Sequence, residues 1–514
     1  IGVSIVEKGT ANGCITDIDG NYTLNVKQGA TLVYSYIGYV ALERKAVAGV
    51  MNIILKEDAQ ALDEVVVVGY GVQKKSSVTG AISQVKSEDI QNRSITRAEE
   101  ALQGKTAGVQ LVSTTSQPGS SPTIRIRGFS SNGTSDPLYV VDGLIVNDLS
   151  SIDPNNIKSM EVLKDAASAA IYGAQAGNGV VLITTKSGSQ GTSSISYDFQ
   201  YSINSLARRP ELLNSQEYLT QMKEADPTFT DVNIRELISN GVWDGVSSTD
   251  WYDVAFNASP ASRHTVTFQG ANDKGSYFLS LNNLYDNGII REDRDTYKRL
   301  SVMLNADYKI KPWLKVGTTA NYANYTSKAI SDGSGGTSYV SMIATVMTLA
   351  PYIADTYPAD ALPTQMQAQI ANGFTLLQNA NGDYYSCLGT MEQVHPMVAI
   401  RMNDKKNTGN SLMGTLYANF TPIKDLVFTT RLGYRIATDN TYTHNNLYYG
   451  SASASNKDRN GVTRTSLSTT YYQWENFVNY NTTLLDTHNI SAMLGMSYSQ
   501  SDQIYVSAGV DKIA

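Results

Sequence analysis

The chain has 514 residues, of which 41% are hydrophobic and 17% charged, and its formal net charge is −7. This length exceeds one ordinary domain, and the charged fraction is too low for a disordered chain. No stretch approaches the roughly 18 to 20 consecutive apolar residues that a spanning helix needs, which excludes a helical membrane protein.

The sequence offers no candidate metal, cofactor or nucleic-acid site. Cys14 and Cys387 are far apart, and neither lies in a CxxC motif or at a zinc-ligand spacing. The four histidines have no HxH or HExxH spacing. No cluster of lysine and arginine is long enough to follow a phosphate backbone. We therefore expect neither a cofactor nor a nucleic-acid partner.

Residues 1–58 are predicted to form a small β-sandwich whose N-terminal strand is missing. The expected strands are Val3–Val6, Cys14–Thr16, Tyr22–Val26, Thr31–Ile37 and Met51–Leu55. Between two of them, Asp17–Asn21 has the composition of a hairpin turn. A calcium loop of the EF-hand type would need glycine at its sixth position, where this chain has Tyr22.

Residues 59–75 contain four consecutive valines, Val65–Val68, flanked by acidic residues and glycine. This composition predicts an extended strand that could add to the edge of a partner's sheet. An ordinary buried strand is the alternative, and the residues alone leave both open. Gly69-Tyr70-Gly71 does not continue as a dinucleotide-binding motif, because the next expected glycine is Lys74 and no helix follows.

Residues 76–190 are predicted to form a compact α/β domain. A capping box at Thr96 and Glu99 predicts a helix, and Asp153-Pro154 predicts a second helix start. The expected strands are Ile124–Gly128, Leu138–Gly143, Met160–Asp165 and Gly179–Thr185. Four charged side chains lack any neighbouring nucleophile or base, so salt bridging is expected of them rather than catalysis: Arg125, Arg127, Lys164 and Asp165.

Residues 191–514 alternate between apolar and polar side chains over long stretches, as in Arg299–Ile310. Roughly nine such strands occur, joined alternately by short turns and long loops, and the chain has 32 tyrosines. Strand length, loop asymmetry and tyrosine content predict part of an antiparallel transmembrane β-barrel. The expected fold is therefore mainly β: a β-sandwich, an α/β domain and the first part of a barrel.

These motifs, in this order, resemble the SusC/RagA family of TonB-dependent outer-membrane transporters, and the resemblance covers essentially the whole chain. Residues 1–58 are similar to its carboxypeptidase-regulatory-like domain and residues 76–190 to its plug domain. The residues that match the TonB box are Asp63, Glu64, Val65, Val66, Val67, Val68 and Gly69. Those that match the structural plug motif are Arg125, Arg127, Gly128, Asp142 and Gly143. The plug pattern continues through Glu161–Gly173 and Asn178–Lys186, with a small departure at Gln175–Gly177.

The resemblance implies a non-enzymatic importer of an oligosaccharide, or alternatively of a peptide, located in the lipid outer membrane. The partners it implies are TonB, which would bind the box in the periplasm, and a SusD-like surface lipoprotein, which would meet the long extracellular loops. Trp251, Tyr448 and Tyr449 are candidates for stacking on sugar rings, and loop packing is the alternative for each.

The length of the chain bears on this resemblance. A 22-stranded barrel at about 35 residues per strand would need roughly 770 residues, so we expect these 514 residues to be a fragment.

Two functions from other classes stay open. A surface adhesin would explain the strands and loops but not the plug, and a secreted glycosidase would need two carboxylates across a cleft, which the sequence does not identify.

Overall fold

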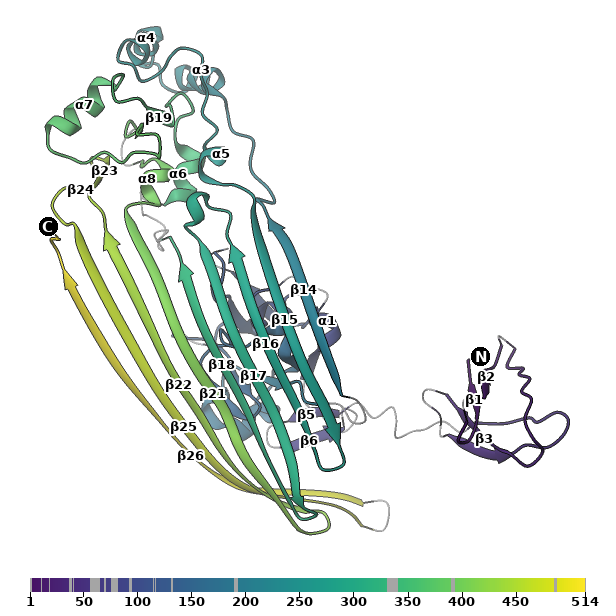
Figure 1. The fold of residues 1–514 in the computed structure, drawn as a ribbon. Coiled ribbons are helices and arrows are strands. Elements are labelled where there is room, and N and C mark those ends of the chain that lie inside the picture. The colour runs from purple at the N-terminus through teal and green to yellow at the C-terminus, as the bar shows by residue number, and fades with distance from the viewer. Residues whose placement is uncertain are drawn as a thin grey trace. The chain divides into compact units, whose positions relative to one another are not determined.

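The structure is a computed structural model of the chain. It describes residues 2–513 except 11, 18, 37–38, 40, 56–64, 69–70, 75–81, 92–94, 114, 116, 131–132, 189–192, 331–340, 390–392 and 485–487. The chain divides into two compact units, Ile1–Ile82 and Ser83–Ala514 (Figure 1).

The first unit is built around a four-stranded antiparallel sheet with the order β2-β1-β3-β4. Its strands are β1 (Ser4–Glu7), β2 (Gly13–Ile15), β3 (Thr31–Ser35) and β4 (Leu42–Lys45). Its buried core consists of Ile5, Leu32, Tyr34 and Ala46. The predicted turn at Asp17 is confirmed, because Asp17 Oδ1 accepts hydrogen bonds from the backbone N of Asp19 and Asn21 at 3.0 and 2.8 Å.

Two predicted strands of this unit, Tyr22–Val26 and Met51–Leu55, are wrong. Neither segment is assigned to a strand, although both run beside the sheet core. Leu24, Val26 and Ile53 are half-buried against that core. The alternation in the sequence therefore reflects burial of every second side chain, without the backbone pairing that defines a strand.

The second unit begins with the predicted plug domain, which has a five-stranded mixed sheet of order β11-β10-β13-β12-β7. These strands are β7 (Ile82–Lys86), β10 (Leu138–Val141), β11 (Leu144–Val146), β12 (Ile157–Leu163) and β13 (Val180–Thr185). Strands β10 and β13 are parallel, whereas β10 with β11 and β12 with β13 are antiparallel. A separate antiparallel pair consists of β8 (Val109–Val112) and β9 (Thr123–Ile126). The short helices of the domain are α1 (Ser87–Gln91), η2 (Ala98–Leu102), η3 (Pro154–Asn156), α2 (Ala166–Ala169) and η4 (Ala170–Ala176).

The helix predicted from Thr96 is the short 3-10 helix η2. The predicted capping box is wrong in one residue, because it assigns the capping carboxylate to Glu99. Glu100, not Glu99, accepts hydrogen bonds from the backbone N of Thr96 and of Arg97, at 3.1 and 3.5 Å. Glu99 instead forms a buried ion pair with Arg97 at 2.7 Å. The helix begins one residue later than the Thr96–Glu99 spacing implies, because Arg97 occupies the N-cap.

A nine-stranded antiparallel sheet follows the plug, as the sequence predicts. Its strands are β14 (Ser194–Asn204), β15 (Ser259–Asn272), β16 (Gly275–Asn287), β17 (Thr296–Lys311), β18 (Leu314–Lys328), β21 (Asn403–Ile423), β22 (Leu426–Asn445), β25 (Gly461–Leu484) and β26 (His488–Val510). They pair in this order, so β14 and β26 are the two edges of a curved, open sheet in the described part of the chain (Figure 1).

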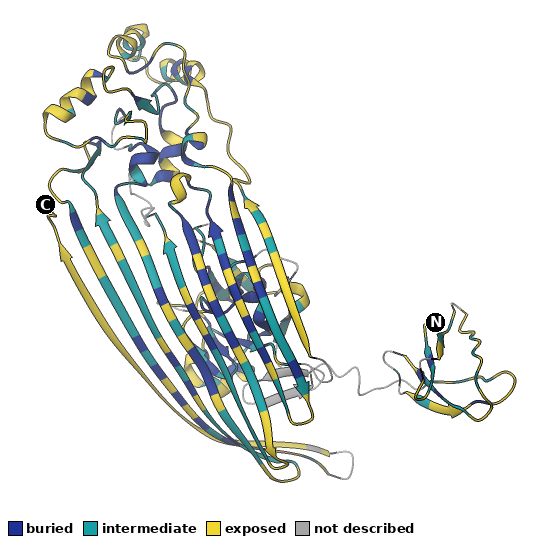
Figure 2. Ribbon diagram, viewed as in Figure 1, coloured by how far each residue is buried: buried dark blue, intermediate teal, exposed yellow. Residues whose placement is uncertain are grey.

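The two faces of this sheet differ as the alternation predicts. On β17, Leu300, Leu304 and Tyr308 are exposed, whereas Arg299 and Met303, which point to the opposite face, are buried. Figure 2 shows the same alternation of buried and exposed residues along the neighbouring strands. The buried side chains face the plug, which packs on the concave side of the sheet (Figure 1).

The long connections gather at one end of the sheet and share a hydrophobic core of their own. Their helices are α3 (Ser215–Ala225), α4 (Asp231–Ser239), α5 (Trp251–Ala255), η5 (Arg291–Asp293), α6 (Met342–Thr348), α7 (Thr364–Ala371) and α8 (Pro396–Ala399). Their short strands are β19 (Thr356–Tyr357), β20 (Tyr384–Tyr385), β23 (Tyr448–Ser451) and β24 (Ala454–Asn456). Short turns join the strands at the other end. None of the helices described has both the length and the apolar character to cross a membrane.

Candidate functional site

The four valines of the candidate TonB box form strand β5 (Val65–Val68), as the sequence predicts. This strand pairs only with β6 (Gly71–Lys74) among the described residues, in antiparallel register from Val65 opposite Lys74 to Val68 opposite Gly71. A strand in a two-stranded sheet has a second edge whose N–H and C=O groups this sheet does not pair. Asp63, Glu64 and Gly69 lie outside the described residues, so binding of TonB by the box stays a prediction.

Three residues of the plug motif end strand β9 and reverse the chain. Arg125 forms an ion pair with Asp136, as expected, and its guanidinium lies 5.5 Å from the ring centroid of Phe129. Arg127 and Gly128 both have positive φ, +58° and +93°. The backbone N of Arg127 donates to the oxygen of Gly108 at 2.9 Å, which fixes the turn. These contacts are structural.

The other two residues of the motif, Asp142 and Gly143, form the tight turn between β10 and β11. The backbone of Asp142 has φ +48°, and its carboxylate accepts hydrogen bonds from Thr185 N at 3.0 Å and Thr185 Oγ1 at 2.6 Å. Burial raises the pKa of Asp142, although the bonds from Thr185 oppose this. The turn is thereby tied to the adjoining end of β13, and Gly143 is left at the surface of the plug that meets the sheet.

Gly143 lies so close to β22 that no side chain fits without a rearrangement. A Cβ atom at this position would overlap Arg431 Nη1, and φ is +87°. Gly143 O also accepts a hydrogen bond from Gln473 Nε2 on β25 at 2.9 Å, while Gln473 Oε1 accepts one from Ile145 N at 3.1 Å. One glutamine of the sheet thus holds both sides of the plug turn.

We expect Gly143→Ala and Gly128→Ala each to cost about 1–2 kcal/mol, since a non-glycine residue at positive φ costs this much, and we expect only Gly143→Ala to loosen the plug further. The new methyl group would also displace Arg431 from Glu475, which lies 3.4 Å away. Gly128→Ala is the matched control, because φ there is +93° but no atom lies within 4 Å of the added Cβ. Limited proteolysis of the plug measures both variants. Equal sensitivity in the two would contradict a role for the contact with Arg431.

A buried ion pair forms the second attachment of the plug to the sheet. Arg299 Nη2 on β17 lies 2.7 Å from Asp153 Oδ2, and both side chains are fully buried. Arg299 Nη1 donates to Ser150 O at 3.0 Å, and Asn321 Nδ2 on β18 donates to Ser151 O at 2.9 Å. The plug segment 150–153 is therefore held by two neighbouring strands.

The sequence predicts Asp153 only as a helix cap. That prediction is confirmed, because Asp153 Oδ1 accepts a hydrogen bond from Asn155 N at 2.9 Å at the start of η3. The pairing with Arg299 was not predicted, although the sequence carries a signal for it. Arg299 stands on the face of β17 that also carries Ser301 and Met303, opposite the apolar face with Val302 and Leu304. An arginine on the inner face of such a strand needs an internal partner.

A polar cavity of about 370 Å³ separates the plug from strands β14 to β16. Its lining is rich in hydroxyl and amide groups: Ser113, Gln117, Gln200, Ser202, Asn204 and Ser262. Gln117 also exchanges two hydrogen bonds with the backbone of Ile330, which follows β18. The cavity therefore lies toward the loop end of the plug.

The three aromatic candidates for substrate binding lie in the loop core. Trp251 is 1% exposed, packs edge-on against His395 at 5.1 Å between ring centroids, and donates from Nε1 to Ala350 O at 3.2 Å. This geometry favours the packing role for Trp251. Tyr448 and Tyr449 are half-buried on the same core, and the ring of Tyr449 lies 4.8 Å from that of Phe374. Their stacking on sugars stays a prediction.

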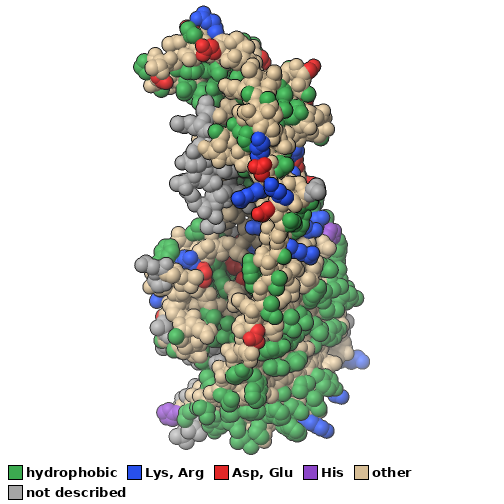
Figure 3. All heavy atoms as spheres, turned by 90° about the vertical axis from the view of Figure 1, so that its left-hand side faces the viewer, with side chains coloured by type: hydrophobic (Ala, Val, Ile, Leu, Met, Phe, Trp, Pro, Cys, Tyr) green, Lys and Arg blue, Asp and Glu red, His purple; other side chains and the backbone are tan. Residues whose placement is uncertain are grey.

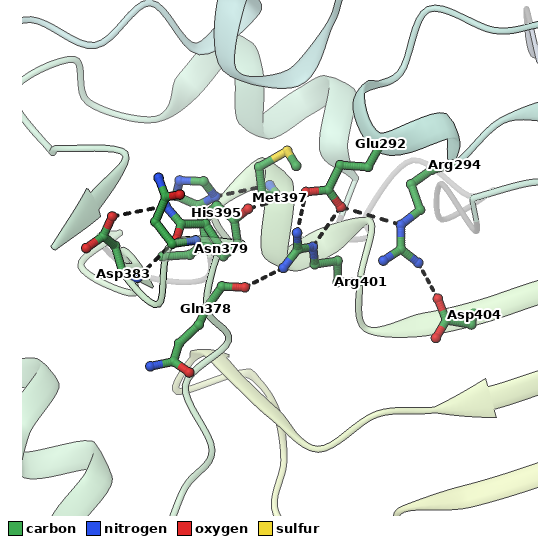
Figure 4. A network of polar contacts seen from close by, with 11 residues as sticks. Glu292, Arg294, Gln378, Asn379, Asp383, His395, Met397, Arg401 and Asp404 are labelled. Carbon is green, nitrogen blue, oxygen red and sulfur yellow. Dashed lines mark hydrogen bonds and ion pairs between the residues drawn. The ribbon is translucent and has the colours of Figure 1, made fainter. Parts of the chain in front are cut away.

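A charged network, not predicted from the sequence, ties the loops together (Figure 4). Glu292 in η5 accepts a hydrogen bond from Arg401 Nε at 2.9 Å, and its Oε2 lies 3.7 Å from Arg294 Nε. Arg294 in turn pairs with Asp404 at the start of β21. Glu292 and Asp293 have positive φ, +65° and +52°, which non-glycine residues rarely adopt. The loop between β16 and β17 is thus held in a strained turn by ion pairs to the next long loop.

Asp295 lies in the same loop and makes the stability of this loop depend on pH. Burial raises the pKa of Asp295 to about 7, with Asp286 and Asp293 adding to the effect. Because an aspartate in an unfolded chain has a pKa of about 3.9, the stabilisation is fully present below about pH 4 and is lost as pH rises through about 7. The loss is at most about 4 kcal/mol, since one pKa unit corresponds to about 1.4 kcal/mol.

We therefore expect Asp295→Asn to slow hydrogen exchange of the Ile290 amide at pH 8 but not at pH 4. Asparagine can still accept the bond that Ile290 N donates to Asp295 Oδ1 at 3.2 Å. Exchange rates corrected for their intrinsic pH dependence give the measurement. The exposed Asp360, replaced by asparagine in the same way, is the control. An unchanged pH profile in Asp295→Asn would contradict the prediction.

Comparisons with known proteins agree with this arrangement. Residues 74–180 match the TonB-dependent receptor plug domain, and residues 1–67 match the CarboxypepD_reg-like domain. The chain is 33% identical over 470 residues to the TonB-dependent receptor SusC of Bacteroides thetaiotaomicron, covering 88% of this chain and 45% of that protein. It is 30% identical over 513 residues to the TonB-dependent receptor P26 of Formosa agariphila, covering 97% of this chain and 48% of that protein.

Solved structures show the same fold. The RagAB peptide importer in its open-open state superposes with a TM-score of 0.70 at 24% identity, covering 88% of this chain and 51% of that chain. A second structure of the RagAB peptide transporter gives a TM-score of 0.69 at 24% identity, covering 84% and 49%. The chain therefore has the fold and the plug domain of the TonB-dependent receptors that it matches. The resemblance to the SusC/RagA type is confirmed, and the chain spans about half the length of the curated relatives it matches.

Proposed function

We propose that the protein imports a nutrient across the outer membrane, driven by TonB. The observation that supports this most directly is the plug, held on the concave face of a long-stranded sheet by Arg299 and Gln473. A wide barrel would leak solutes without such a plug. A surface adhesin would not need one.

In this proposal, TonB binds the box residues Asp63–Gly69 in the periplasm by strand addition. Strand β5 is extended and already pairs through its backbone with β6, so it has the conformation that edge-strand recognition requires. Main-chain hydrogen bonds would give the grip, and TonB would pull through them. Such a pull would apply force to two contacts between the plug and the sheet, the turn at Gly143 and the segment 150–153.

The proposed substrate is an oligosaccharide, and a peptide is the alternative. The family resemblance implies a sugar, and aromatic side chains can stack on sugar rings. The relatives named RagAB, in contrast, are peptide importers. We propose that the substrate passes the polar cavity at Gln117 and Asn204, because hydroxyl and amide groups can bond either to sugar hydroxyls or to a peptide backbone. A SusD-like surface lipoprotein would deliver it to the long loops.

Deleting residues 63–69 from the intact gene in its native host tests the proposal. Outer-membrane levels are confirmed by blotting, and growth is followed on a panel of polysaccharides and on peptides as sole nutrient. Loss of growth on one glycan supports TonB-driven sugar import, and loss on peptides alone supports the alternative. Normal growth on a substrate for which the intact gene is required would contradict a role for the box.

A further inference from the structure

An apolar groove of about 570 Å³ runs across the face of the sheet that points away from the plug, on strands β17, β18, β21 and β22. Its floor consists of the half-buried side chains of Val316, Thr318, Ala418 and Thr430. Tyr308, Leu416 and Leu432 border it and are 51%, 51% and 42% exposed. The strand register places Tyr308, Val316, Ala418 and Thr430 side by side in one row across the four strands. The floor side chains are smaller than Tyr308, Leu416 and Leu432 at the border, and this difference in size forms the groove.

The alternation of the strands fixes which way the groove faces. Met413 on β21 belongs to the core of the plug, so Leu416 and Ala418, which have the opposite parity, point outward. If the sheet is part of an outer-membrane barrel, this face meets lipid. The inference therefore rests on the membrane location in the proposed function, but not on TonB or on the substrate.

Aromatic rings and lysines lie between the groove and the short turns. The rings of Trp313, Phe420 and Phe428 form a row, with centroids 6.4 and 6.0 Å apart. Beyond them, Lys311 and Lys424 are exposed at the ends of β17 and β21. Figure 3 shows hydrophobic side chains gathered over the lower part of the molecule, with lysine or arginine side chains along its lower border. Rings at this level and cations beyond them are typical of the membrane interface.

The depth of the groove matches one leaflet. Leu416 is seven residues from Ile423, the end of β21, and a strand rises about 3.3 Å per residue, which gives about 23 Å. A strand tilted by about 45° then reaches about 16 Å into the membrane, close to half of a hydrocarbon core about 30 Å thick. An acyl chain whose headgroup lies at the turns would therefore end within the groove.

We propose that the groove binds one acyl chain of an anionic phospholipid, whose phosphate lies at Lys311 and Lys424. The small floor residues admit the chain, Tyr308 and Leu416 flank it, and the aromatic row supports the glycerol region. Two ammonium groups match a negatively charged headgroup in both sign and depth, which selects anionic over zwitterionic lipids. The occupant is a membrane lipid rather than a second copy of this chain.

Native mass spectrometry of the intact receptor tests the proposal. The receptor is purified from outer membranes in mild detergent, delipidated, and then titrated with phosphatidylglycerol or phosphatidylethanolamine. We expect the wild type to retain one phosphatidylglycerol. Filling the groove by Thr318→Leu with Ala418→Leu should weaken this binding about tenfold, equivalent to about 1.4 kcal/mol. Thr438→Leu on β22 is the matched control, because it adds the same side chain to the outward face above the groove and should change nothing.

A second pair of changes tests the headgroup. Lys311→Gln with Lys424→Gln should weaken phosphatidylglycerol binding and leave phosphatidylethanolamine binding unchanged. Equal lipid binding by the wild type and the groove-filled protein would overturn the proposal. It would also be overturned if the wild type were a dimer without bound lipid and filling the groove made it a monomer, because a second copy of the chain would then occupy the groove. TonB-dependent uptake measured on the same variants separates the two proposals. Intact uptake with unchanged lipid binding would overturn only the lipid site, and lost uptake after a change in the box would leave it unaffected.

Discussion

Val66→Pro should abolish energised uptake and leave binding of substrate at the cell surface unchanged. Proline has no backbone N–H and fixes φ near −65°, so it removes one donor from β5 and bends the strand. Strand addition depends on these main-chain donors and far less on the side chains. We expect uptake to fall to the level of the deletion of residues 63–69, measured with labelled substrate in whole cells.

Two further variants make this prediction specific. Val66→Ala keeps the backbone donor and changes only the side chain, so it should retain uptake. Val67→Pro removes the donor that points to the opposite edge of the strand, because adjacent residues in an antiparallel pair direct their N–H groups to opposite sides. A comparison of the two prolines shows which edge TonB uses, the edge facing β6 or the other. Normal uptake in both proline variants would contradict the assignment of the box.

Much of the fold could be predicted from the sequence because its periodicity is local. The alternation from Arg299 to Ile310 predicts β17 and both of its faces, and the same pattern predicts the nine-stranded sheet. The prediction failed at Tyr22–Val26, where every second side chain is buried although the backbone forms no strand. It also failed at Glu99 and Glu100, because the helix begins one residue later than predicted. Both errors concern backbone hydrogen bonds, which side-chain patterns report only indirectly.

The contacts between plug and sheet could not be predicted, because they join residues that are far apart in the chain. Asp153 and Arg299 are separated by 146 positions, and Gly143 and Gln473 by 330. Each has a plausible local role of its own, a helix cap for Asp153 and a turn for Gly143. The sequence therefore explains why these residues are present but not which partners they meet. Only the packing of the plug on the concave face brings them together.

The ion pair between Asp153 and Arg299 should be the costliest plug contact to break from one side. Arg299→Met leaves the buried Asp153 carboxylate without the one cation that pairs with it directly, and removal of one partner of a buried pair typically costs about 3–5 kcal/mol. We expect the plug to detach more readily, which faster hydrogen exchange at the backbone of Ser151 and Asn155 would report. Asp136→Asn is the control. It breaks the ion pair of Arg125 with a carboxylate that is 55% exposed, and such pairs contribute about 1 kcal/mol or less.

A double variant separates the charge from the packing. Asp153→Asn with Arg299→Met removes both charges, and the asparagine keeps an oxygen that can accept the bond from Asn155 N at the start of η3. Because a buried pair replaced by neutral groups is often close to neutral in free energy, we expect the double variant to recover most of the lost protection. If it is no better than Arg299→Met alone, the arginine acts through its bonds to the oxygens of Ser150 and Ile152. Recovery would mean that segment 150–153 is attached to β17 mainly by charge, so that a pull on the plug works there against an electrostatic contact that can separate and reform.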